Sequence, residues 1–360
     1  MRSPADDRAA SAGHRAVVLP ESIEQQREGT PFQSIGGDME VTTDFMNWEM
    51  VERDQFGRVV GLAAQVGGKT RRLPVYRVLA PVDGSPASLA ALRVAASMAG
   101  RSAGSALHVL NVQTIIGNTS DDDTLMDAGL AETEDARRSL GEADGRYHLQ
   151  LTAGNPAEVI LAYARRQRIT EIVMGADGAG SVACALLGSV ALDVLENTDI
   201  AVTLVKSRHR ARQFAAGTGD LLVVCDGSAG SLRALHHALE YTGKLTDGPR
   251  IHLLNVHRAD DGPFLGRPTA RDADIRSGDR ERALQASDAA LRTLDAARAN
   301  YEVHVAQGDP VDKILELATS IDCDRIVMAS HGLGWFAGLT AGSISWSVLY
   351  RTVIPITLVK

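Results

Sequence analysis

Nearly continuous apolar runs alternate with stretches of helical spacing along most of the chain. VYRVLAPV at 75–82 is an apolar run that ends at Asp-Gly-Ser, which predicts a buried strand followed by a turn. Ser85 and Pro86 then supply an N-cap and a first helical residue. Asn155 and Pro156 repeat this arrangement further along, and Asp309 and Pro310 repeat it in the second half of the chain. Further strands are expected at 106–112, 147–153, 169–175 and 200–206, and further helices over 122–144 and 188–197.

The strands in this pattern are apolar on both faces and are separated by helices. Such strands indicate a parallel sheet that is covered by helices on both sides. This part of the chain is therefore predicted to be a βαβαβαβαβ doubly wound, Rossmann-like unit.

The second half of the chain repeats the first. DGSPASLAAL at 83–92 matches DGSAGSLRAL at 226–235 in seven of ten positions, and both halves end in TLVK. The offset between matching residues is 143 at Asp83 and Asp226, and 154 at Gly154 and Gly308. One insertion region accounts for most of this change. We expect an N-terminal extension at 1–74, a first domain at 75–206, a linker at 207–219 and a second domain at 220–360.

A glycine pattern follows the fourth predicted strand of each repeat. In the first repeat it reads Gly175-x2-Gly178-x9-Gly188-Ser189, and in the second Ala329-x2-Gly332-x9-Gly342-Ser343. Glycine lets a backbone take positive φ and approach a phosphate, and a helix N-terminus favours an anion. In open α/β sheets, ligands bind beyond the carboxyl ends of the strands where the strand order reverses. The pattern therefore predicts a phosphate site, although the same glycines could simply make a tight strand-to-helix turn.

Both repeats resemble the universal stress protein family. The resemblance is carried by the G-x2-G-x9-G-[ST] spacing, the Asp-Gly-Ser turn and the Val-Met-Gly or Val-Met-Ala end of the fourth strand. It implies two tandem five-stranded parallel domains of the adenine nucleotide alpha hydrolase-like type, with strand order 3-2-1-4-5, that bind ATP with Mg²⁺. The cofactor-binding residues implied are Val82, Asp83, Gly84, Val112, Met174, Gly175, Gly178, Gly188, Ser189 and Val190 in the first repeat. In the second repeat they are Asp226, Gly227, Val256, Met328, Ala329, His331, Gly332, Gly342, Ser343 and Ile344.

The two repeats differ where the phosphates would lie. The first has Asp177, whose carboxylate would repel a triphosphate unless Mg²⁺ lay between them. The second has His331 at this place, although Ala329 replaces the first glycine. We therefore expect the second repeat to be the better ATP site.

Several other chemical signals are weak. GGKT at 67–70 lacks the earlier glycine of a P-loop and is followed by a strand rather than a helix. His108 and His252 lie within predicted strands and are expected to be structural, and no cluster has metal-ligand spacing. Cys184, inside the first glycine pattern, could be a redox-sensitive thiol or a buried, inert one. No residue stands out as catalytic.

Composition narrows the function further. Lys+Arg 37 against Asp+Glu 45 gives a net charge of −8, which does not suggest a nucleic-acid partner. The chain has no apolar run long enough for a membrane span and no secretory signal, so we expect a cytoplasmic protein. Residues 1–40 are expected to be flexible, and 56–66 to form a strand or hairpin that packs on the sheet.

Two classes of function remain from the sequence. One is an ATP-binding, stress-response regulator with at most slow hydrolysis. The other is an interaction protein of the same fold with degenerate pockets, and a slow ATPase is the weakest alternative. The resemblance also implies association through the fifth strands, either within one chain as a pseudo-dimer or between two chains as a homodimer. The protein partner is unknown.

Overall fold

The computed structural model describes residues 50–53, 59–66, 76–102, 104–114, 122–140, 147–177, 187–207, 219–243, 245, 248–257, 287–330 and 344–360. All the helices and strands described below lie within Met46–Lys360.

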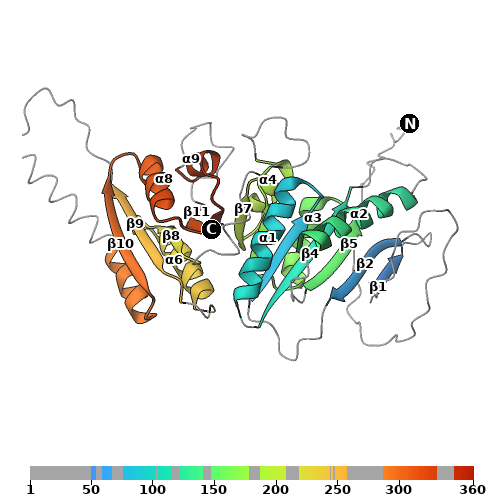
Figure 1. Cartoon of the computed structure of the whole chain (residues 1–360), viewed down its shortest axis with the longest axis horizontal. Coiled ribbons are helices and arrows are strands. Elements are labelled where there is room, and N and C mark those ends of the chain that lie inside the picture. The colour runs from blue at the N-terminus through green and yellow to red at the C-terminus, as the bar shows by residue number, and fades with distance from the viewer. Residues whose placement is uncertain are drawn as a thin grey trace, which may run out of the picture. The chain divides into compact units, whose positions relative to one another are not determined.

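The first repeat is a doubly wound, five-stranded parallel sheet (Figure 1). Its strands lie in the order β5-β4-β3-β6-β7, which is the predicted 3-2-1-4-5, and all neighbours in this set are parallel. The elements in chain order are β3 (Tyr76–Val82), α1 (Pro86–Arg101), β4 (Ser105–Gln113), α2 (Asp122–Leu140), β5 (Tyr147–Ala153), α3 (Pro156–Arg166), β6 (Glu171–Gly175), α4 (Ser189–Glu196) and β7 (Ala201–Val205).

The second repeat has the same topology, with strand order β10-β9-β8-β11-β12 and parallel neighbours throughout. The predicted fold class is therefore confirmed in both repeats. The elements of the second repeat are β8 (Leu221–Val224), α6 (Ala229–Thr242), β9 (Ile251–His257), a helix over 287–296, β10 (Tyr301–Gln307), α8 (Pro310–Ser320), β11 (Arg325–Ala329), α9 (Ile344–Arg351) and β12 (Ile356–Val359).

The predicted helix starts form as the sequence indicates. Ser85 caps α1 by accepting from the backbone N–H of Ser88, and Pro86 is the first helical residue. Asn155 and Asp309 cap α3 and α8 in the same way, each followed by proline. These capping interactions fix where each helix begins after the preceding strand.

Two hydrophobic layers enclose the sheet, and each runs through both repeats. One contains Val78 with residues of α1, α2 and α6, and the other contains Leu79 with residues of α3, α4, α8 and α9. Adjacent residues of a strand point to opposite faces, which is why each central strand must be apolar along its whole length.

A hairpin extends the sheet beyond the first repeat. β1 (Met50–Arg53) and β2 (Val59–Val66) pair antiparallel, and β2 in turn pairs antiparallel with β5, from Gly61 opposite Thr152 to Val66 opposite Tyr147. The predicted strand at 56–66 is thus confirmed as part of a hairpin on the sheet (Figure 1). At the other end of the strand order, β10 is the last strand.

The two repeats join into one sheet through β7 and β12. These strands pair antiparallel with Thr203 opposite Thr357, and the two hydroxyl oxygens lie 2.6 Å apart. Thr203 and Thr357 are matching positions of the repeat, because their numbers differ by the offset of 154. The junction is therefore a local two-fold axis within a single chain.

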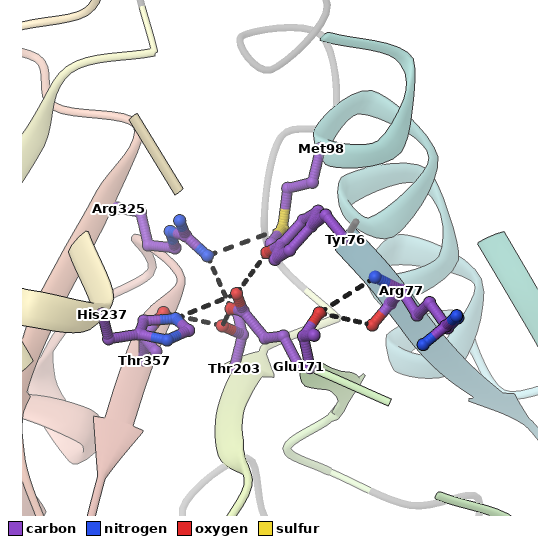
Figure 2. Close-up of polar contacts among 9 residues, drawn as sticks. Tyr76, Arg77, Met98, Glu171, Thr203, His237, Arg325 and Thr357 are labelled. Carbon is purple, nitrogen blue, oxygen red and sulfur yellow. Dashed lines mark hydrogen bonds and ion pairs between the residues drawn. The ribbon is translucent and has the colours of Figure 1, made fainter. Parts of the chain in front are cut away.

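A buried ion pair lies beside this axis (Figure 2). Arg325 Nη1 is 2.6 Å from Glu171 Oε1, and both side chains are almost completely buried. Glu171 also accepts from the hydroxyls of Tyr76 and Thr203 and faces His237 Nε2 at 3.0 Å. The structure turns His237 toward Glu171, while its neighbour His236 on α6 is exposed.

The aromatic ring of Tyr241 lies beneath the guanidinium of Arg325, with 4.3 Å between Cζ and the ring centroid. Burial alone would raise the pKa of Glu171, but attraction to Arg325 and then to His237 outweighs burial and holds this pKa at about 2. The carboxylate is therefore ionised wherever the protein is folded at ordinary pH.

Candidate functional site

Asp83 follows the carboxyl end of β3 and is held in a tight turn. The backbone N–H and the hydroxyl of Ser85 both donate to Asp83 Oδ1, at 3.1 and 2.6 Å. Gly84 takes a positive φ of 73°, a conformation that glycine adopts without strain. The turn therefore presents an oriented, exposed carboxylate at the end of the first strand of the domain.

The second repeat builds the same turn at Asp226. The backbone N–H of Ser228 donates to Asp226 Oδ1 at 3.0 Å, and Gly227 has a φ of 81°. Partial burial raises the pKa of Asp226, but hydrogen bonds from Ser228 and then Ser231 outweigh it, so this pKa lies below its ordinary value. Asp226 is thus an ionised acceptor at neutral pH.

A buried asparagine supports each of these turns from the neighbouring strand. Asn111 Nδ2 donates to the carbonyl of Val82 at 2.9 Å, and Asn255 Nδ2 donates to the carbonyl of Cys225 at the same distance. The side chains fix the strand ends next to Val112 and Val256, which follow them directly. These asparagines were missed in the sequence, where the repeated Leu-Asn-Val in the second strand was the available signal.

Gly175 is required by a close approach between β6 and α1. A Cβ at Gly175 would lie 2.9 Å from the backbone nitrogen of Ser88 and 3.0 Å from the carbonyl carbon of Ala87. The end of the fourth strand therefore abuts the first turn of α1, directly after the Asp83 turn. This contact explains the glycine by packing, and it also brings the Asp-Gly-Ser turn and the start of the glycine loop together at the carboxyl end of the sheet. We call this place the first crevice, and the matching place beside the Asp226 turn and the end of β11 the second crevice.

Gly188 is the N-cap residue of α4 and, having no side chain, leaves the helix without a side-chain cap. Its own N–H donates to the carbonyl of Ala176 at 2.8 Å, which fastens the returning chain to the strand end. The first N–H groups of α4, beginning at Ser189, favour an anion because they lack intrahelical partners. Ser189 is exposed, whereas Val190 packs against the hydrophobic layer.

The described part of the second crevice matches the first. Met174 and Met328 are both buried before the loop, and Ser330 N–H donates to the Val359 carbonyl as Ala176 N–H does to that of Val205, each at 2.8 Å. The Ala329 carbonyl accepts from Ser345 Oγ at 2.9 Å, near the start of α9 at Ile344. The remaining predicted site residues, Gly178, His331, Gly332, Gly342 and Ser343, lie outside the described residues.

Asp177 does not present a free carboxylate to the first glycine loop. Its Oδ1 accepts from the backbone N–H of Ser207 at 3.1 Å, and its Oδ2 accepts from the Ser207 hydroxyl at 2.5 Å. The aspartate that was expected to face the phosphates is therefore engaged by the residue that follows β7.

Glu132 of α2 lies in the first crevice, which the sequence did not predict. Its Oε2 accepts from Asn111 Nδ2 at 2.6 Å and from Gln113 Nε2 at 3.1 Å. Its Cγ is 3.0 Å from the position that a Cβ on Gly84 would occupy. A carboxylate thus lies over the Asp83 turn, between the ends of β3 and β4.

Two of the three cysteines, Cys225 and Cys323, are free and buried. Burial raises the pKa of the Cys323 thiol to about 12, so it stays protonated. Cys184 lies outside the described residues. Within the described ranges, no helix combines the length and apolar character needed to cross a membrane.

Two doubly wound parallel domains in tandem, each with an aspartate turn at the point where the strand order reverses, place the chain in the class of open α/β proteins. The universal stress protein family model matches residues 75–206 and 218–360. The chain belongs to this family.

Several relatives are universal stress proteins. The chain is 28% identical over 138 residues to one from Methanocaldococcus jannaschii, covering 36% of this chain and 81% of the relative. It is 32% identical over 141 residues to one from Thermus aquaticus, covering 39% and 97%. With one from Mycobacterium bovis it shares 29% identity over 210 residues, 56% of this chain and 61% of that protein.

A crystal structure of a universal stress protein from Archaeoglobus fulgidus has the same fold. Its TM-score is 0.57 at 24% identity, and the match covers 79% of this chain and 98% of that one. At this identity the likeness establishes the architecture alone.

Proposed function

We propose that the protein binds ATP with Mg²⁺ and acts as a nucleotide-dependent regulator of a stress response. Family membership supports this proposal, and one observation carries it: each repeat holds an oriented aspartate and a buried asparagine at the carboxyl ends of its first two strands. Carboxylate and backbone acceptors at this place suit the N–H and O–H donors of an adenosine, beyond the strand ends where ligands bind in such sheets.

The phosphates would be held by backbone N–H groups at the helix that follows the glycine loop. In the first repeat the start of α4 has no side-chain cap, so its N–H groups are available to an anion. The Mg²⁺ would be held chiefly by phosphate oxygens, which it prefers to an all-protein cage. When bound, it neutralises phosphate charge.

We propose the second crevice as the main ATP site. In the first crevice Glu132 lies over the Asp83 turn and would repel an anionic ligand. Thr133 and Ala136 of α2 match Ser287 and Ala290 by the offset of 154, and all four are buried. By the same offset the second repeat has Ala286 where the first has Glu132.

Calorimetric titration of the full chain with ATP and Mg²⁺ tests both the binding and the ranking. Asp226→Ala removes the acceptor of the second crevice and is expected to weaken binding by about tenfold, or 1.4 kcal/mol. Gly342→Val places a branched side chain in the second glycine loop and is expected to abolish binding there. The matched variant Asp83→Ala, in the first crevice, is expected to leave the affinity within about twofold.

Unchanged affinity in both Asp226→Ala and Gly342→Val would overturn the assignment to the second crevice. If the wild-type chain gives no heat of binding and releases no adenine nucleotide on denaturation, the protein does not bind ATP. The packing explanation of Gly175 and the position of Glu132 would then favour an interaction protein of the same fold. Multiple turnover that Asp226→Ala removes would instead indicate a slow ATPase.

The pairing of the two fifth strands, β7 and β12, also limits how two chains could associate. β7 lies between β6 and β12, and β12 lies between β7 and β11, so both edges of each fifth strand are paired within the chain. A homodimer through these strands would have to break the intramolecular pairing. We therefore propose that the fifth strands serve the pseudo-dimer and not association between chains.

A further inference from the structure

Three side chains with metal-ligating atoms converge near the amino ends of β9 and β10. His252 is the second residue of β9, and Glu302 and His304 are the second and fourth residues of β10. The strands are parallel with His252 opposite Glu302, so His304, two residues further on, points to the same face. Their ligand atoms all lie within 4.8 Å of one another.

The distances suit a small, tetrahedral cation. His252 Nδ1 is 3.0 Å from His304 Nε2, 3.8 Å from Glu302 Oε2, and His304 Nε2 is 3.9 Å from Glu302 Oε1. Bond lengths of zinc to nitrogen and oxygen place tetrahedral ligands about 3.3–3.5 Å apart. Each observed distance is within roughly half an ångström of this spacing. The two histidines face different oxygens of Glu302, so rotation of that carboxylate is needed to bring one oxygen close to both. Two imidazoles and one carboxylate suit Zn²⁺ rather than Mg²⁺ or Ca²⁺.

The surroundings of His252 support the same assignment. Its other ring nitrogen, Nε2, lies 4.0 Å from Asp220 Oδ2, and Asp220 Oδ1 accepts from the backbone N–H of Arg250 at 2.7 Å. A carboxylate behind the distal nitrogen is the usual partner of a metal-bound histidine. Arg250 Nη1 also lies 3.3 Å from Glu302 Oε2, but both of these side chains are about half exposed, so this pair holds Glu302 weakly.

The first repeat provides an internal comparison. By the repeat, His108 matches His252, His148 matches Glu302, and Gln150 matches His304. His108 Nδ1 is hydrogen-bonded to the hydroxyl of Tyr163 at 2.8 Å, so this histidine is satisfied within the core as the sequence predicted. The second repeat has Leu317 in place of that tyrosine, and the same nitrogen of His252 faces another imidazole instead.

We propose that His252, Glu302 and His304 form a Zn²⁺ site, with the fourth position open to water or an external ligand. The sequence predicted no metal cluster, because the three residues come together only when β9 and β10 pair. The site is at the amino ends of the strands, whereas Asp226 follows the carboxyl end of β8. It therefore does not depend on the proposed nucleotide site.

The test is a competition titration of the tag-free full chain with Zn²⁺ against a chromophoric chelator. One equivalent is expected to bind, and Co²⁺ is expected to give the visible absorption of a tetrahedral site. His304→Gln, which installs the residue found in the first repeat, and Glu302→Gln are each expected to weaken Zn²⁺ binding at least about tenfold. The matched variant His148→Gln, in the first repeat, is expected to leave the affinity unchanged.

Glu302 is half exposed, so Glu302→Gln keeps the test decisive if His304→Gln fails to fold. Zn²⁺ is also expected to raise the melting temperature of the wild-type chain and not that of Glu302→Gln, because a ligand stabilises only the state that binds it. Failure to retain Zn²⁺, or equal affinity in both variants and the wild type, would overturn the site. The site would also be overturned if His148→Gln lost Zn²⁺ binding while His304→Gln and Glu302→Gln kept it.

Discussion

Single side chains account for the difference between two crevices built on one plan. The Asp83 and Asp226 turns, with Asn111 and Asn255 behind them, are the same in both repeats. Glu132 breaks this likeness, since its carboxylate occupies the space above Gly84. Repetition in the sequence identified the aspartates. It could not place Glu132, because nothing in the spacing of a charged helix tells which glutamate turns inward.

Replacing Glu132 by alanine is expected to open the first crevice. The variant gives this position the residue that the second repeat has at 286 and removes a negative charge from the path of an anionic ligand. Calorimetry with ATP and Mg²⁺ should then show a second binding event with an affinity at least about tenfold above that of the first crevice in the wild type. Glu134→Ala removes a partly exposed carboxylate of the same helix and is the control. It should leave ATP binding unchanged. An unaltered stoichiometry in Glu132→Ala would show that the carboxylate does not close the site.

At the scale of strands and helices, local patterns predicted most of what forms. The apolar runs gave β3, β5 and β7 to within a residue at either end, and the capping residues Ser85, Asn155 and Asp309 gave the helix starts. The pairing of β7 with β12 could not be chosen from the sequence. Identical TLVK ends are compatible with pairing inside one chain or between two, and only the folded arrangement decides.

The junction between β7 and β12 is expected to weaken in acid. The pKa of Glu171 is about 2 in the folded chain, below its ordinary value of 4.5, so the stabilisation is complete above the ordinary value. It is lost as the pH falls from about 5 toward 2, where the unfolded chain takes up the proton first. Urea unfolding measured across this range should show the free energy of unfolding falling with pH. The slope should be smaller in Glu171→Gln, and an identical slope would remove Glu171 as its source.

Across the whole molecule, the most informative difference between the repeats is a reversal of charge. Glu171 and Arg325 are matching positions, since they differ by the offset of 154, and they meet beside the local two-fold axis. If either repeat paired with a copy of itself in this way, two like charges would be buried together. The ion pair is therefore compatible with the first repeat joining the second and incompatible with self-pairing.

Charge exchange at these two positions tests that specificity. Glu171→Arg alone buries two cations together and is expected to destabilise the chain by about 3–5 kcal/mol, as loss of a buried pair does. Adding Arg325→Glu restores opposite charges and should recover part of this loss. The coupling energy from a double-mutant cycle, measured by urea unfolding, should be favourable and above about 1 kcal/mol. Additive effects would mean that the two residues act independently.

The antiparallel join also fixes the direction in which each half faces. β7 and β12 run in opposite directions. Measured along the strands, the carboxyl ends of the first repeat's strands therefore lie at one end of the continuous sheet, and those of the second repeat's strands lie at the opposite end. Molecules held in the two crevices could not touch. Any thermodynamic linkage between them would have to cross the threonine pair and the buried carboxylate at the centre of the sheet, and it would act equally in both directions.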